Sequence, residues 1–118
     1  MLVIHPLQEF VIGDDWVING QMTDELGNPL DPTPASSIIW KFDDETGETN
    51  LFTLTLAGGG IVIGAIPAWS VPGVIVKLPV ASTSTLTPGT YRDQIRMVLG
   101  GQTSTYWMGP IQAVQQLT

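Results

Sequence analysis

The segment from residue 38 to residue 56 reads IIWKFDDETGETNLFTLTL and places two alternating apolar runs on either side of an acidic turn. In each run an apolar side chain recurs at every second position: Ile38, Trp40 and Phe42, then Phe52, Leu54 and Leu56. This period of two is typical of β-strands that bury one face. The intervening residues, Asp43 to Glu48, contain a glycine and predict the tip of a hairpin that joins the two strands.

The same alternation extends in both directions along the chain. Its further apolar sets are Trp16, Ile18 and Met22; Val74, Val76 and Leu78; Tyr91, Ile95 and Met97; and Trp107. Glycine and proline interrupt the chain at short intervals, so no segment is long enough for a helix of several turns. Gly100 and Gly101 predict another hairpin, and Val80 to Pro88 is compatible with a single helical turn capped by Ser82 or Thr83.

We therefore expect an all-β fold, an antiparallel β-sandwich of about eight strands and of the immunoglobulin-like kind. The length of 118 residues suits a single domain that spans residues 1–118. Within this domain, residues 1–12 form either a terminal arm or an edge strand. The pattern itself leaves these two alternatives open.

Composition limits the classes of protein to which the chain can belong. Charged residues make up only 13% of it, and a weakly charged surface is readily desolvated when proteins assemble. The chain has no cysteine, which excludes disulfides and thiolate metal sites. Its first residues lack the basic and apolar regions of a signal peptide, and its longest apolar stretch, residues 58–68, is too short for a membrane span. We expect no membrane insertion.

The charge of the chain bears on its partners. The net charge of −7 comes from eleven carboxylates against Lys41, Lys77, Arg92 and Arg96. Nucleic acids are bound through contacts of lysine and arginine with phosphates. Four cations divided among separate segments do not supply the basic stripe that such binding requires. The sequence therefore argues against nucleic acid as a partner.

Residues that could carry catalysis are scarce. His5 is the only histidine and is interpreted as a terminal surface residue, so no histidine-based triad is expected. Acidic pairs such as Asp14-Asp15 lie in predicted turns, where aspartate bonds the nearby backbone. We expect a protein that is not an enzyme and that uses no cofactor.

One acidic loop is a weak candidate for a calcium site. It carries several hard oxygen ligands around a glycine: Asp43, Asp44, Glu45 and Glu48. Their spacing is not that of an EF-hand loop. A solvated hairpin tip is the favoured interpretation.

Aromatic residues are the best candidates for contact with a ligand or partner. Of the four tryptophans, Trp16 and Trp40 fall in the inward sets and are assigned to the core. Trp69 lies in a loop, where contact and packing are equally open roles. Tyr106 and Trp107 occupy opposite faces of one strand, so one of them is expected to face solvent or an interface. Trp69, Tyr106 and Trp107 are the predicted contact residues, with glycans as one class of ligand.

Several turn motifs follow one another along the chain. They are GDDW at residues 13–16, TDELGNPLD at 23–31, IIWKF at 38–42, LTPGTY at 86–91 and GPI at 109–111. In this order they resemble the motifs of small immunoglobulin-like modules of tailed phages and prophages, including the N-terminal module of phage baseplate upper proteins. The resemblance covers nearly the whole chain, from Gly13 to Val114.

This resemblance implies a virion structural or accessory protein of the tail, baseplate or neck, made in the cytoplasm of the host bacterium. It implies self-assembly into a homo-oligomer and docking to other phage structural proteins, with no catalytic residues. The glycines at 58–60 ahead of Ile61 suggest an edge that another chain approaches. The alternative hypothesis is a carbohydrate- or surface-binding β-sandwich module that uses Trp69 with Tyr106 or Trp107.

Overall fold

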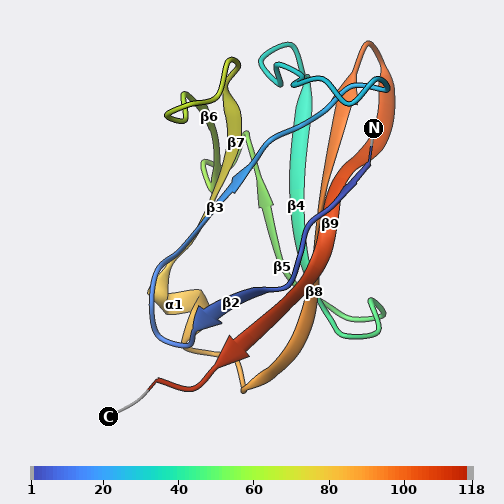
Figure 1. Ribbon diagram of the computed structural model, residues 1–118. Helices are drawn as coiled ribbons and strands as arrows, with labels where there is room; N and C mark the ends of the chain where they lie inside the picture. The colour runs from blue at the N-terminus through green and yellow to red at the C-terminus, as the bar shows by residue number, and fades with distance from the viewer. Residues whose placement is uncertain (1, 117–118) are drawn as a thin grey trace.

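Nine strands and one helical turn are formed within residues 2–116, the part of the chain that the computed structural model describes (Figure 1). In chain order they are β1 (Val3–Ile4), β2 (Gln8–Val11), β3 (Trp16–Gly20), β4 (Ser37–Asp44), β5 (Asn50–Thr55), β6 (Ile61–Gly64), β7 (Gly73–Leu78), α1 (Val80–Thr83), β8 (Gly89–Leu99) and β9 (Gln102–Val114). The strands form two sheets that pack around one core, which confirms the predicted all-β sandwich. No helix within residues 2–116 has the length and hydrophobicity that a membrane crossing requires.

The two sheets differ in size. The larger has the strand order β1-β9-β8-β4-β5, with β2 also paired to β9, and the smaller has the order β3-β7-β6. Figure 1 shows the smaller sheet on the left and the larger on the right. The expected antiparallel pairing holds except at one edge, where β1 and β2 run parallel to β9. The N-terminal segment and the C-terminal strand run side by side there, without a hairpin that would impose opposite directions. Residues 3–4 and 8–11 are thus edge strands.

Both predicted hairpins are present, since their turns contain the residues that such turns require. At the β4–β5 hairpin, the Asp44 carboxylate accepts hydrogen bonds from the Thr46 hydroxyl at 2.9 Å and the Glu48 amide at 3.0 Å. At the β8–β9 hairpin, Gly100 and Gly101 have φ of +58° and +78°. Two consecutive residues with positive φ make the tight turn whose twist matches that of the flanking strands.

The core lies between the sheets and is built from the inward side chains of both. The predicted alternating sets are buried, none more than 9% exposed: Trp16, Ile18, Met22, Ile38, Trp40, Phe42, Val74, Val76, Leu78, Tyr91, Ile95 and Met97. The set at residues 52–56 is only partly buried, because β5 is the edge strand of the larger sheet. Phe42 lies near the centre, with its ring centroid 5.9 Å from that of Trp16 and 5.0 Å from that of Tyr91.

The helical turn α1 connects the smaller sheet to the larger, as expected, but Ser82 and Thr83 do not cap it. Its N-cap position is Pro79, which makes no side-chain capping bond. The Asp15 carboxylate instead accepts a hydrogen bond from the Val80 amide at 2.9 Å. The cap comes from a segment 65 residues away in the sequence, so the residues around α1 do not reveal it.

Candidate functional site

His5 is buried, with only 5% of its surface exposed, and the interpretation of it as a surface residue is wrong. Its backbone amide donates a hydrogen bond to the Met108 carbonyl at 2.9 Å, which continues the pairing of β1 with β9. The ring centroid lies 4.2 Å from that of Trp107. The ring also lies directly over Gly109, where an added Cβ would be only 2.6 Å from the ring carbon Cε1. The absence of a side chain at position 109 therefore makes room for the ring.

The His5 ring is held in a buried polar cluster. Its Nε2 lies 2.5 Å from the Oδ1 of Asp93, and its Nδ1 lies 2.7 Å from the Pro6 carbonyl oxygen. The other Asp93 oxygen accepts a hydrogen bond from the Trp40 indole at 2.9 Å. Both ring nitrogens face acceptors, so a doubly protonated imidazolium donates to both while the Asp93 carboxylate accepts from two sides. Burial lowers the pKa of His5, but the hydrogen bonds to Asp93 and Pro6 outweigh it and raise that pKa above its usual value.

Asp93 is a buried acidic residue whose inward position can be read from the sequence, but the sequence analysis did not single it out. It lies between Tyr91 and Ile95 at the same two-residue spacing, and so belongs to the inward face of β8. It is 2% exposed. A carboxylate at an inward position needs hydrogen-bond donors. The pattern therefore contained evidence of a buried polar partner, but it did not show that the partners are His5 and Trp40.

We expect the His5–Asp93 pair to make the stability of the protein depend on pH. The pKa of His5 is raised above its usual value of 6.5 in the folded protein, so the folded state holds the proton more tightly than the unfolded state does. The stabilisation is complete below about pH 6.5 and is lost as the pH rises through the raised folded pKa.

Two measurements check this dependence: NMR titration of the His5 Cε1 proton, and urea unfolding over the range from about pH 5 to pH 9. His5→Gln is the control, in which the loss of stability above neutral pH is expected to disappear. A histidine that titrates at or below its usual value would contradict the prediction.

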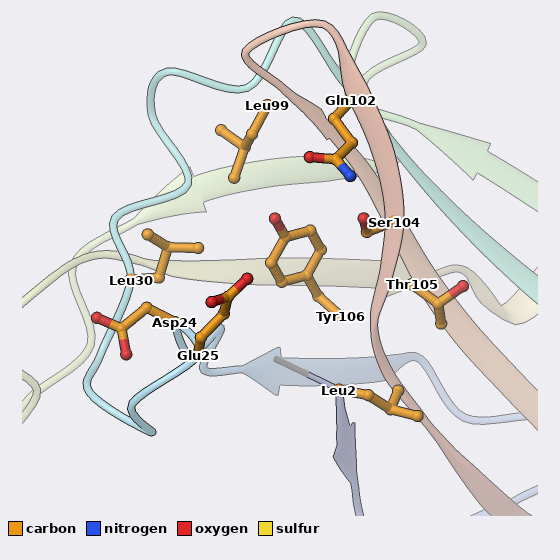
Figure 2. A pocket seen from close by; sticks show the side chains of 9 residues that line it. All are labelled: Leu2, Asp24, Glu25, Leu30, Leu99, Gln102, Ser104, Thr105 and Tyr106. Carbon is orange, nitrogen blue, oxygen red and sulfur yellow. The ribbon is translucent and has the colours of Figure 1, made fainter.

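A second feature is an open hollow of about 430 Å³ around Tyr106 (Figure 2). Its lining combines a phenol ring with acidic, polar and aliphatic side chains: Leu2, Asp24, Glu25, Leu30, Leu99, Gln102, Ser104, Thr105 and Tyr106. Figure 2 shows the Tyr106 ring in the middle of this group. The loop after β3, the β8–β9 hairpin and the N-terminal segment all contribute to the hollow.

A β-bulge places Tyr106 in this position. Ile95 pairs with Trp107 and Arg96 pairs with Thr105, which leaves Tyr106 as the extra residue of β9. A bulge of this kind re-aims the side chains around it. Tyr106 is half-buried and packs partly against the core, whereas strict alternation would have made it a simple surface residue.

The other two predicted contact residues are not at the hollow. Trp107 is 4% exposed and lies against His5, so it has no free face with which to contact a ligand. Trp69 is half-buried and packs on Gly73, where an added Cβ would be 2.6 Å from a carbon of the indole. Of the three predicted contacts, the structure places only Tyr106 in the lining of the hollow.

The acidic side chains of the calcium candidate either serve the hairpin turn or face solvent. Among residues 2–116 no group of three acidic or histidine side chains is arranged to hold a metal ion. Asp44 accepts the hydrogen bonds of the hairpin turn, and Asp43 accepts a hydrogen bond from the side-chain Nδ2 of Asn50 at 2.8 Å. Glu45 and Glu48 are exposed at the tip. This arrangement corresponds to the solvated hairpin tip.

The edges of both sheets share a further property. Within residues 2–116 five strands lie at edges, and four of them contain neither a charged residue nor a proline: β1, β3, β5 and β6. β2 has a single charge, Glu9. Cations stand instead on inner strands, and strand register brings Lys41, Arg92 and Arg96 to the outer face of the larger sheet. Four of these five edge strands therefore lack the charges and prolines with which monomeric proteins block strand pairing.

Comparison of the sequence with protein-family models and with curated proteins finds no match.

Proposed function

We propose that this protein is a non-enzymatic structural module of a phage or prophage virion, which assembles with copies of itself and docks to other virion proteins. The observation that carries the proposal is the lack of charge and proline in four of the five edge strands. An unprotected edge presents unpaired N–H and C=O groups to a neighbouring chain. Such an edge is a liability for a monomer and a binding surface for an assembling protein.

We also propose that the sandwich is of the immunoglobulin-like kind, and side chains at the start of β8 and on β4 support this. Tyr91, at the start of β8, donates a hydrogen bond from its hydroxyl to the Thr87 carbonyl at 2.6 Å, the bond typical of a tyrosine corner. Trp40 is buried on β4, which lies between β8 and β5 in the larger sheet. Asp93 stands two residues after the corner tyrosine, where antibody domains carry a cysteine of their inter-sheet disulfide. In this chain a hydrogen-bonded Asp93 with Trp40 and His5 takes that place.

The proposal of a non-enzymatic role rests on the chemistry of His5. Both of its ring nitrogens are within hydrogen-bond distance of Asp93 and Pro6, and the ring is covered by Trp107. A general base must reach the proton of a substrate directly or through one water. His5 is therefore interpreted as a group that attaches the N-terminal segment to the larger sheet.

Substitution of one edge residue tests assembly. Val62 of β6 alternates with the buried Ile61, so a lysine at position 62 faces away from the core and blocks the edge. We expect the wild-type protein to form a discrete oligomer in size-exclusion chromatography with light scattering. Val62→Lys is expected to shift it to monomer without change in the far-ultraviolet circular dichroism spectrum.

Ser84→Lys, at the exposed end of α1, is the matched control and is expected to leave the oligomer intact. A wild-type protein that stays monomeric at high concentration overturns the assembly proposal. An oligomer that persists in Val62→Lys moves the interface away from the β6 edge.

A further inference from the structure

The hollow around Tyr106 carries negative charge that is not neutralised within it. Asp24 and Glu25 line it, and no lysine or arginine does so in the part of the chain that the structure describes. Asp24 already serves the loop, because its Oδ1 accepts hydrogen bonds from the Leu26 and Asn28 amides, each at 2.9 Å. Figure 2 shows the Glu25 carboxylate directed toward the Tyr106 ring. Glu25 is therefore the carboxylate available to a ligand.

The walls of the hollow suit an aliphatic chain with a charged end. Leu30 and Leu99 lie near the Tyr106 ring and offer apolar surface. Lysine and arginine bury their aliphatic stems on such surface while the charged group stays near water. An aromatic ring attracts a cation to its face, and an adjacent carboxylate adds to that attraction.

We propose that this hollow binds an arginine or lysine side chain presented by a partner protein. The stem packs between Leu30 and Leu99, and the charged group lies between the Tyr106 ring and Glu25. A neutral sugar would desolvate the carboxylates without neutralising them, so the charge of the hollow favours a cation over a glycan. The proposal concerns recognition of a side chain and not strand pairing, so its test is distinct from that of self-assembly.

Blocked arginine is the probe that tests the site. The full chain, labelled with ¹⁵N, is titrated with N-acetyl-arginine methylamide and separately with the matched citrulline compound, which has the same shape without the charge. Amide shifts are expected at residues 24–30 and 99–106, with arginine binding at least about fivefold more tightly than citrulline. Added salt is expected to weaken the arginine complex, because an exposed ion pair is screened.

Two variants and a control complete the test. Glu25→Gln is expected to weaken arginine binding about fivefold, and Tyr106→Leu about threefold. Glu9→Gln removes one charge outside the hollow and is expected to leave binding unchanged. Because Glu25 is exposed, its substitution does not threaten the fold. Equal binding of citrulline, shifts outside the hollow, or binding of an oligosaccharide in place of arginine would overturn the proposal.

Discussion

Replacement of Asp93 by alanine is expected to lower the free energy of unfolding by about 3–5 kcal/mol. The substitution leaves the buried His5 imidazolium without its carboxylate and the Trp40 indole N–H without its acceptor. Removing one partner of a buried ion pair exposes the full cost of burying the other. Equilibrium unfolding in urea measures the loss, provided that the slope of the transition matches that of the wild type.

The control for this prediction is Glu45→Ala, at the exposed tip of the β4–β5 hairpin, which is expected to change stability by less than about 0.5 kcal/mol. A double variant adds a sharper test. If the buried His5 destabilises the fold only when Asp93 is absent, then adding His5→Ala to Asp93→Ala is expected to lower the free energy of unfolding little further. A loss below about 1 kcal/mol for Asp93→Ala would mean that the cluster does not stabilise the fold.

Replacement of Gly109 by alanine is expected to expel the His5 ring and to cost about 2–3 kcal/mol. The new methyl group would lie 2.6–2.7 Å from three atoms of the ring. Gly109 cannot easily move away, because it sits in β9 opposite Asp93 of β8. The ring must leave instead, and the pairing of β1 with β9 is expected to open with it.

Hydrogen exchange at one backbone amide measures this opening. The His5 amide, bonded to the Met108 carbonyl at 2.9 Å, is expected to lose its protection in Gly109→Ala. Gln112→Ala lies in the same strand, but its side chain faces away from the core, and it is expected to leave His5 protected. Wild-type protection of the His5 amide in Gly109→Ala would show that the ring can be accommodated elsewhere.

Much of the fold follows from local features of the sequence. Alternation at Ile38, Trp40 and Phe42 predicts which side chains enter the core, because the two faces of a strand alternate whatever lies beside it. Gly100 and Gly101 predict the β8–β9 hairpin, because glycine takes positive φ values at little cost. These predictions need only neighbouring residues, and the structure confirms them.

The candidate sites depend on contacts between distant segments. Asp93 needs a donor because of its inward position. That donor, His5, lies just after β1, 88 residues away in the sequence, and the parallel pairing of β1 with β9 brings it there. A one-residue shift in the register between β8 and β9 directs the Tyr106 side chain into the hollow.

The amino-acid sequence by itself therefore determined the sandwich, its hairpins and most of its core, because periodicity and turn chemistry act over a few residues. Only the tertiary structure decided that His5 is buried, that Trp107 is covered, and that Tyr106 shares a hollow with Glu25. Those outcomes depend on which strands become neighbours and in which register. That choice minimises the energy of the whole packed chain, and no single segment encodes it.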